Sequence, residues 1–264
     1  MGKFEGKSVF LTGGSTGIGR QTALDFAREG AFVTIFDINE EDGNKTAEEC
    51  KTAGAAKTLF VKGDVSNYES VDGAVQKAFD EMGTVDILIN SAGVLRDNMI
   101  HKMPEKDFDF VIAINLKGVY LTIQACAKRW VAKCKEMGKL RPNEYPDRRI
   151  INISSMAATG NIGQMNYAAS KAGVVGMTLT AAKELVRYNV RSHAVKPTVV
   201  ATPLTEGLLT KAEGKFKDMY EGKIPFGIGK TSYVSDVILF LAGPESFFMN
   251  GNVLEINGGK LGEL

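Results

Sequence analysis

The sequence predicts an α/β protein built on one doubly wound parallel β-sheet, and three observations support this prediction. Short apolar runs rich in β-branched residues alternate with amphipathic helical segments along the chain of 264 residues, as is typical of a parallel sheet covered on both faces. No repeat, low-complexity stretch or linker interrupts the alternation. A chain of this length buries about three quarters of its unfolded surface, so we expect a single domain over residues 1–264.

Seven segments are predicted as strands because they are short, apolar and bounded by glycines or polar turns. They are residues 8–11, 32–36, 58–61, 85–90, 149–153, 190–195 and 253–256. Helical spacing of apolar residues predicts the helices between them. Four of them are residues 40–51, 108–137, 167–187 and 235–241. Two more are a helix that ends at Gly30 and a helix that begins with a capping box from Ser66 to Glu69. Residues 138–148 are expected to form an exposed excursion, and residues 203–230, which lack a period, a mobile substrate loop.

Composition and charge exclude several classes of protein. Hydrophobic residues make up 44% of the chain and charged residues 24%, which is ordinary for a globular protein. The 32 basic and 31 acidic residues nearly cancel, so no strong positive field favours nucleic acid or an anionic membrane. The uninterrupted apolar runs are far shorter than the roughly 18 residues of a membrane span, and the first residues lack a signal-peptide core. We therefore expect a cytoplasmic protein that binds neither nucleic acid nor membranes.

Cysteine and histidine are sparse. The three cysteines form no C-x-x-C pair, and this odd count suits reduced thiols better than disulfides. His101 and His193 lie far apart in the sequence, whereas a zinc site needs a cluster of ligands. We expect both histidines to be surface or loop residues, and we expect no metal site.

A glycine-rich turn, T-G-G-S-T-G-I-G from Thr12 to Gly19, directly follows the first strand. Glycines in such a turn let backbone N–H groups approach a pyrophosphate at the positive end of the next helix. Asp37 ends the second strand, about 20 residues farther on, where a carboxylate accepts hydrogen bonds from adenosine ribose hydroxyls. That charge would repel a 2′-phosphate, so NAD is favoured over NADP. The alternative interpretations are that the glycine-rich turn is only structural and that Asp37 is a solvated acid at the end of the strand.

Tyr167 and Lys171 are four residues apart on a predicted helix, so their side chains share one face. An ammonium group at that distance is expected to lower the pKa of the phenol by about two units, toward neutrality. A tyrosine so activated exchanges a proton with an alcohol oxygen. The Y-x-x-x-K pattern alone is common and usually structural, but here it follows the fifth strand, whose carboxyl end is expected to face the cofactor crevice.

Six ordered motifs resemble those of the short-chain dehydrogenase/reductase family over essentially the whole chain. They are Thr12 to Gly19, Asp64-Val65, Asn90-Ser91-Ala92-Gly93, Asn115, Asn152-Ile153-Ser154-Ser155 and Tyr167 to Lys171. The resemblance implies a Rossmann fold and a catalytic tetrad of Asn115, a serine, Tyr167 and Lys171. Tyr167 would be the acid/base, Lys171 would hold the nicotinamide ribose, the serine would orient the substrate oxygen and Asn115 would anchor a water relay.

The resemblance also implies a set of cofactor-binding residues. They are Gly13, Ser15, Thr16, Gly17, Ile18, Gly19, Asp37, Asp64, Val65, Asn90, Ala92, Gly93, Tyr167, Lys171, Val200 and Thr202. One departure affects the last two positions, because the family's Pro-Gly is here Pro197-Thr198, preceded by an unusual Lys196.

The identity of the catalytic serine needs a separate argument. Tyr167 follows Ser155 by 12 residues and Ser154 by 13, which is the usual family spacing. Successive strand side chains point to opposite sides, so only one serine can face the nicotinamide. The loop 156–163 can lose a residue more cheaply than the strand can shift its register. We therefore predict Ser155.

The predicted function is that of an NAD-dependent oxidoreductase that interconverts a secondary alcohol and a ketone by hydride transfer. The resemblance is nearest to 3-oxoacyl-thioester reductases and 3-hydroxyacyl dehydrogenases. A hydroxysteroid or cyclic secondary-alcohol dehydrogenase is the alternative among enzymes. A catalytically silent dinucleotide sensor is the alternative outside them, although it would not need the tetrad.

The resemblance further implies a homotetramer in which the helices 108–137 and 167–187 pair across a two-fold axis. Cys126, Trp130 and Cys134 recur on one face of the first of these helices, which suits either that interface or the core. The segment Arg96-Asp97-Asn98 resembles one found in 3-oxoacyl reductases and could equally be a solvated loop.

Overall fold

The computed structural model describes residues 2–210 and 222–260, and this part of the chain contains a sheet of seven parallel strands. The strands are β1 (Ser8–Thr12), β2 (Phe32–Asp37), β3 (Thr58–Lys62), β4 (Ile87–Asn90), β5 (Arg148–Ile153), β6 (Val190–Pro197) and β7 (Val253–Ile256). Their order across the sheet is β3-β2-β1-β4-β5-β6-β7. The predicted doubly wound parallel sheet is confirmed.

The order in which the chain adds strands to the sheet reverses between β1 and β4. Strands β2 and β3 lie on one side of β1, and strands β4 to β7 lie on the other. Thr12, at the end of β1, pairs in register with Phe36 on β2 and with Asn90 on β4, so the carboxyl ends of these strands lie at one level. Ligands of such sheets bind outside the carboxyl ends at the reversal point. The topology therefore locates the expected cofactor crevice above β1 and β4.

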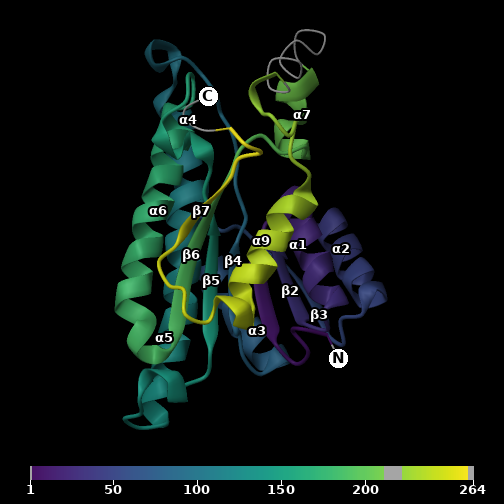
Figure 1. Cartoon of the computed structure of the whole chain (residues 1–264), viewed down its shortest axis with the longest axis vertical. Helices are drawn as coiled ribbons and strands as arrows, with labels where there is room; N and C mark the ends of the chain where they lie inside the picture. The colour runs from purple at the N-terminus through teal and green to yellow at the C-terminus, as the bar shows by residue number, and fades with distance from the viewer. Residues whose placement is uncertain (1, 211–221, 261–264) are drawn as a thin grey trace.

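Helices cover both faces of the sheet (Figure 1). One face packs against α1 (Gly17–Arg28), α2 (Glu40–Ala53) and α9 (Thr231–Ala242). The other face packs against α3 (Tyr68–Met82), α5 (Gly118–Glu136) and α6 (Met165–Leu185). Burial of these apolar stripes is the main stabilising contribution to the fold.

Cys126, Trp130 and Cys134 on α5 are all fully buried within the chain. The indole N–H of Trp130 donates a hydrogen bond of 2.7 Å to the carbonyl of Val85. Of the two interpretations of this stripe, the structure favours the core over a subunit interface.

Helix α3 begins one residue later than its predicted capping box. Asn67 is the N-cap, and its side chain accepts a hydrogen bond from the backbone N–H of Ser70. Ser66 instead donates its hydroxyl to Asp64. The predicted box from Ser66 to Glu69 is therefore wrong, because the adjacent asparagine caps the helix.

The predicted helix 108–137 is longer at its start and is interrupted. It consists of α4 (Glu105–Ile112), a π-helical turn (Ala113–Lys117) and α5. This run, Glu105–Glu136, is the one helix among the described residues that is long and apolar enough to cross a membrane. Leu121, Ala125 and Trp130 pack it into the core against the sheet.

The segment predicted as a mobile loop, 203–230, opens with a helix, α7 (Pro203–Thr210). Proline suits the first helical position because its missing N–H would have no partner there. Thr205 ties the turn before α7 together, since its hydroxyl donates to the carbonyl of Val200 and accepts from the N–H of Thr202. Residues 211–221 of the predicted loop lie outside the described residues.

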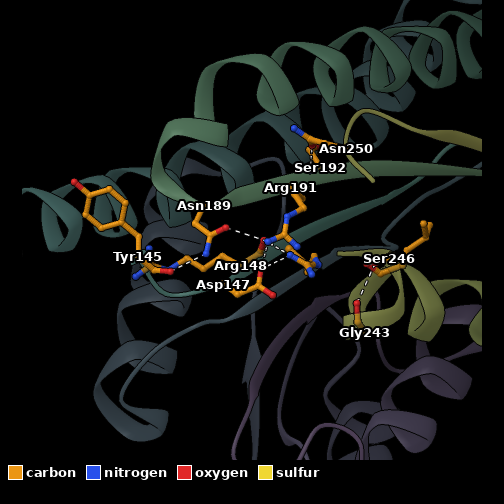
Figure 2. Close-up of polar contacts among 11 residues, drawn as sticks. Tyr145, Asp147, Arg148, Asn189, Arg191, Ser192, Gly243, Ser246 and Asn250 are labelled. Carbon is orange, nitrogen blue, oxygen red and sulfur yellow. Dashed lines mark hydrogen bonds and ion pairs between the residues drawn. The ribbon is translucent and has the colours of Figure 1, made fainter. Parts of the chain in front are cut away.

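His101 is exposed as predicted, but the prediction for His193 is wrong. His193 is fully buried in the middle of β6, and neither ring nitrogen has a hydrogen-bond partner in the described part of the chain. It follows Arg191 on the same face of the strand. Arg191 lies opposite Arg149 on β5. Arg191 pairs with the carboxylate of Asp147 (Figure 2), and Arg149 pairs with the same carboxylate.

Candidate active site

A cavity of about 400 Å³ opens at the carboxyl ends of the strands. One end is lined by Asp37 and Asp64, and the other by Ser155, Tyr167 and Lys171. The motifs predicted to bind the adenosine half of a cofactor and those predicted to carry out the chemistry are thus joined by one continuous space.

Two glycines of the turn after β1 are required by close backbone approaches. Gly13 has φ +67°, and a Cβ there would lie 2.6 Å from the Cα of Ala92. A Cβ at Gly19 would lie 2.0 Å from the carbonyl oxygen of Gly13. Thr16 precedes α1 without making a side-chain cap, so first-turn N–H groups remain available to an anionic group at this end of the helix.

Asp37 is held at the end of β2 by two backbone donors. The N–H of Ser15 donates to Oδ2 and the N–H of Asn39 donates to Oδ1, each at 3.0 Å. These bonds orient the carboxylate at the cavity wall. Each carboxylate oxygen has further acceptor capacity, which suits the two hydroxyls of a ribose.

Asp64 and Val65 line the same end of the cavity. The Oδ1 atom of Asp64 accepts both the N–H and the hydroxyl of Ser66, at 2.8 Å each. This turn fixes the chain as it leaves β3.

Asn90, predicted as a cofactor-binding residue, is not among the residues that line the cavity. It is buried in a chain of hydrogen bonds that crosses the sheet: Thr122 donates to Asn90, Asn90 to Asn152, and Asn152 to Thr178. Every link is shorter than 3.0 Å. The chain ties β4 and β5 to α5 and α6, so Asn90 fixes the strand ends beneath the cavity.

Asn115 lies in the π-helical turn, and its side chain binds the backbone of Val94 in both directions. Its Oδ1 accepts the Val94 N–H at 2.8 Å and its Nδ2 donates to the Val94 carbonyl at 2.9 Å. The position of a Cβ on Gly93 would be 3.5 Å from this Oδ1 and 3.7 Å from the Nζ of Lys171. Asn115 therefore braces the loop after β4 beside Lys171; π-helical turns occur frequently at functional sites.

The two candidate serines have different environments. Ser154 is buried, and its hydroxyl donates to the backbone carbonyl of Lys171 at 2.8 Å. Ser155 is half-buried, accepts the N–H of Ala157 and forms a side-chain hydrogen bond with Tyr167. Of the two hydroxyls, that of Ser155 is the one paired with the phenol.

Tyr167 and Lys171 are neighbours on α6, with the ammonium nitrogen 5.5 Å from the centre of the phenol ring. Burial raises the pKa of Tyr167 to about 12, although the hydrogen bond with Ser155 lowers it. The predicted shift toward neutrality is therefore wrong for the protein without ligands, because loss of hydration outweighs the nearby ammonium group. Burial also lowers the pKa of Lys171 to about 8, and its Nζ donates to the carbonyl of Ile153 at 2.7 Å.

Most of the predicted site residues line the cavity. They are Gly13, Thr16, Ile18, Gly19, Asp37, Asp64, Val65, Ala92, Gly93, Ser155, Tyr167, Lys171, Val200 and Thr202. Ser15 and Gly17 line a smaller adjoining cavity of about 340 Å³.

Sequence reasoning did not single out four further residues that line the cavity. They are Phe110, Ile114, Leu204 and Thr205, of which the last two belong to the predicted substrate loop 203–230. Their position depends on how α4, the π-helical turn and α7 pack at the strand ends, which no local pattern in the sequence reveals. Nowhere in residues 2–210 and 222–260 do three or more His, Cys, Asp or Glu side chains form a group that could hold a metal ion.

The segment Arg96-Asp97-Asn98 packs against the loop before α6. Gln164 donates to the carboxylate of Asp97, and the N–H of Asn98 donates to the carbonyl of Gly163. Arg96 and Asp97 are nonetheless exposed, as the solvated-loop interpretation expects, and the likeness to the segment of 3-oxoacyl reductases stays a prediction.

Comparison with known proteins agrees with this geometry. The model of the short chain dehydrogenase family matches residues 7–213. The chain is 39% identical over 259 residues to the 3-oxoacyl-(acyl-carrier-protein) reductase FabG of Thermotoga maritima, covering 97% of this chain and 98% of that protein. It is 36% identical over 266 residues to the (3R)-3-hydroxyacyl-CoA dehydrogenase of Canis lupus familiaris, covering 95% of each.

Solved structures of similar proteins superpose closely on this chain. Levodione reductase superposes with a TM-score of 0.87 at 27% identity, covering 97% of this chain and 98% of that one. The 3-ketoacyl-(acyl-carrier-protein) reductase of Brucella melitensis, solved with NADH, gives a TM-score of 0.83 at 30% identity with the same coverage.

The fold and the site define an oxidoreductase that uses a nicotinamide dinucleotide. The chain belongs to the short-chain dehydrogenase/reductase family. The cavity fits such a cofactor, because the glycine turn and the first turn of α1 can take the pyrophosphate and Asp37 can take the adenosine ribose.

Proposed function

We propose that this protein is an NAD-dependent oxidoreductase that interconverts a 3-hydroxyacyl thioester and a 3-oxoacyl thioester by hydride transfer. The observation that carries the proposal is the Ser155, Tyr167 and Lys171 group at one end of a cavity whose other end holds the Asp37 carboxylate. The names of the relatives in Thermotoga maritima and the dog support the thioester substrate.

The nicotinamide supplies or accepts the hydride when it is bound. On the substrate side, the hydroxyl of Ser155 orients the carbonyl oxygen through a hydrogen bond. Tyr167, whose raised pKa keeps the phenol protonated at neutral pH, donates its proton to that oxygen in the direction of ketone reduction. Lys171 holds the ribose next to the nicotinamide.

Alcohol oxidation needs the reverse transfer, in which Tyr167 accepts the proton. The ammonium group of Lys171 stabilises the phenolate that this direction requires, because it lies 5.5 Å from the ring. The raised pKa of Tyr167 keeps the phenol protonated and therefore favours the direction of ketone reduction at neutral pH.

A substrate panel tests the proposal. Acetoacetyl-CoA, 3-hydroxybutyryl-CoA, a cyclic secondary alcohol and a hydroxysteroid are assayed with NAD(H) and NADP(H), following the absorbance of the reduced nicotinamide. We expect the thioesters to give the highest kcat/KM. Preferential turnover of the cyclic alcohol or steroid would favour the alternative enzyme, whereas NADH binding without turnover of any substrate would favour a silent sensor.

Asp37 is proposed to set the preference for NAD. Replacing it in the double variant Asp37→Ser/Ile38→Arg removes the repulsive carboxylate and adds a cation at Ile38, which lines the cavity and is 68% exposed. We expect the ratio of kcat/KM for NADP to that for NAD to rise at least about tenfold, since one lost repulsion and one gained charge pair are each worth about 1 kcal/mol. Ile38→Arg alone is the control and should change the ratio less. Equal use of NAD and NADP by the unmodified protein would show that Asp37 does not select the cofactor.

We further propose a homotetramer, which needs two distinct self-complementary interfaces. The outer surfaces of α5 and α6 enclose a groove of about 910 Å³ lined by Ile123, Ala127, Val131 and Met177 among others. A second apolar surface follows α9, where Tyr233, Phe240, Phe247 and Phe248 are exposed. If two copies pair through the α5–α6 groove and two such dimers pair through the α9 surface, both apolar surfaces are covered in the tetramer.

The tetramer is tested by light scattering at micromolar concentration, with a tetrameric mass expected. Met177→Arg places a charge in the α5–α6 groove and should reduce the mass to that of a dimer or monomer. Thr52→Arg, on the exposed surface of α2, is the matched control and should leave the mass unchanged. A monomeric mass for the unmodified protein is the result that rules out the tetramer.

We also propose that the chain is a single-domain cytoplasmic enzyme in which residues 203–230 form the substrate loop. The balanced charge supports the location. Leu204 and Thr205 on α7 support the loop's role, because both line the reaction cavity.

A further inference from the structure

Asn166, the residue before Tyr167, is fully buried, and its side chain is hydrogen-bonded to two other parts of the chain. Its Nδ2 atom donates to the carbonyl of Arg96, in the loop after β4, at 2.9 Å and to the carbonyl of Asp107, in α4, at 3.3 Å. Its Oδ1 atom accepts the N–H of Tyr167 at 2.7 Å. One amide therefore joins the first turn of α6 to the loop after β4 and to α4.

The loop after β4 is also held by Asn115, from the other side. Asn115 binds both backbone groups of Val94, and Asn166 binds the carbonyl of Arg96, two residues farther along the loop. Both asparagines are fully buried, and a buried amide that loses a backbone partner is costly. Because Val94 lines the reaction cavity, the two amides together fix this part of the cavity wall between the π-helical turn and α6.

The second acceptor of Asn166 connects it to another part of the wall. Asp107 lies one turn before Phe110 in α4, and Phe110 lines the cavity. The guanidinium of Arg96 lies 5.0 Å from the centre of the Phe110 ring, so the two carbonyls that Asn166 holds belong to segments in contact with each other. The position of the Tyr167 phenol relative to this wall therefore depends on the Asn166 amide.

We propose that Asn166 is a positioning residue for proton transfer by Tyr167. Asn166 is not among the residues that line the cavity, so it acts through the placement of Tyr167 and not on the substrate. The tetrad implied by the family resemblance leaves Asn166 without a role. The inference rests on the proposed function, in which Tyr167 exchanges a proton with the substrate oxygen.

Asn166→Asp tests the inference, because it keeps the size of the side chain and the oxygen that accepts the Tyr167 N–H. An ionised aspartate has no donor for the two carbonyls, whereas a protonated one regains a donor. Burial raises the pKa of a carboxyl, so protonation falls within the range from about pH 8.5 to about pH 5.5. Asn166→Ala lacks the donor at every pH.

We expect both variants to lower kcat about 10²-fold at about pH 8.5, the usual effect of displacing a catalytic group by about 1 Å. As the pH falls to about 5.5, the kcat of Asn166→Asp relative to that of the unmodified protein should rise at least about tenfold. The relative kcat of Asn166→Ala should stay constant. The Kd for NADH should change less than about threefold in either variant, since Asn115 still holds Val94.

The measurement is kcat with the best substrate of the panel, divided by the number of sites found by NADH titration at each pH. The charged residues at or next to the two acceptors are Arg96, Asp97, Lys106 and Asp107. They are common to all the proteins compared, so their titration cancels in the ratio to the unmodified protein.

Asn250→Asp is the matched control. Asn250 likewise donates to a backbone carbonyl, that of Ala182, and accepts the N–H of Ser192 (Figure 2). Ser192 lies near the start of β6, at the opposite end of the strand from the cavity. Asn250→Asp should lower the Tm without changing kcat per NADH-binding site at any pH.

Three results would overturn the inference while the unmodified protein is active. They are an unchanged kcat in both variants at about pH 8.5, a loss in Asn166→Asp that is the same at every pH, and a loss of NADH affinity as large as the loss of kcat. Failure of both variants to fold at about pH 5.5 would also overturn it, since the amide would then support the fold itself. An unmodified protein that binds NADH but turns over no substrate would overturn the proposed function, and this inference with it.

Discussion

Ser155→Ala is expected to lower kcat about 10²–10³-fold, the usual effect of removing one donor to a developing oxyanion. The hydroxyl of Ser155 lines the cavity and is paired with Tyr167, so it can follow the substrate oxygen as charge develops there. Ser154→Ala should change kcat much less, because the hydroxyl of Ser154 is occupied by the carbonyl of Lys171.

Steady-state kinetics of the two alanine variants, with the best substrate of the panel, measures this ranking. Ser154→Ala also serves as the matched control for a neighbouring change of the same size. It should lower the free energy of unfolding by about 1 kcal/mol through the lost hydrogen bond, while its kcat stays near that of the unmodified protein. A larger kcat loss in Ser154→Ala than in Ser155→Ala would mean that the residue missing from the family spacing lies within the strand.

The protein is expected to lose about 3 kcal/mol of stability as the pH falls from about 6.5 to about 4, because of His193. Burial lowers the pKa of His193 from 6.5 to about 4, with Arg149 and Arg191 adding repulsion. In this range the unfolded chain binds a proton at this histidine and the folded chain does not. Protonation therefore favours the unfolded state, and the loss is complete below the folded pKa.

Urea unfolding at several values between about pH 7 and pH 4.5 measures the effect. His193→Gln removes the titrating group and should flatten the dependence of the unfolding free energy on pH. His101→Gln is the matched control: His101 is exposed, so its removal should leave the dependence unchanged. If the unfolding free energy of His193→Gln depends on pH as steeply as that of the unmodified protein, other groups cause the acid sensitivity.

Features determined by neighbours in the sequence were predicted well. The strand that ends at Thr12, the glycine turn after it and the pairing of Tyr167 with Lys171 depend on local composition and on spacings of a few residues. The structure has all three. Ser155 was chosen because a loop loses a residue more cheaply than a strand shifts its register. Its hydroxyl is paired with Tyr167 in the structure, and its catalytic role stays a prediction.

Features that depend on distant parts of the chain were predicted less well. His193 was expected at the surface, yet the strand that holds it is covered on both faces, so its burial follows from packing that no local pattern reveals. The pKa of Tyr167 was given the wrong direction because the spacing to Lys171 is visible in the sequence and the loss of hydration is not. The cap of α3 was misassigned by one residue, since Ser66 and Asn67 are both good caps and only the turn at Asp64 decides between them.

The π-helical turn at Ala113–Lys117 has a consequence for the phase of the helix that contains it. A turn closed over five residues rather than four holds one extra residue, so every side chain beyond it is rotated by about 100° relative to an uninterrupted α-helix. The apolar stripe of α4 can then face α6 while that of α5 faces α3 and the sheet. Removing one residue here would restore a regular helix, but it would bring the two stripes into line and rotate the amide of Asn115 away from Val94. The longest helical run among the described residues therefore carries what amounts to a one-residue insertion, on which two packing directions and the contact of Asn115 with Val94 depend.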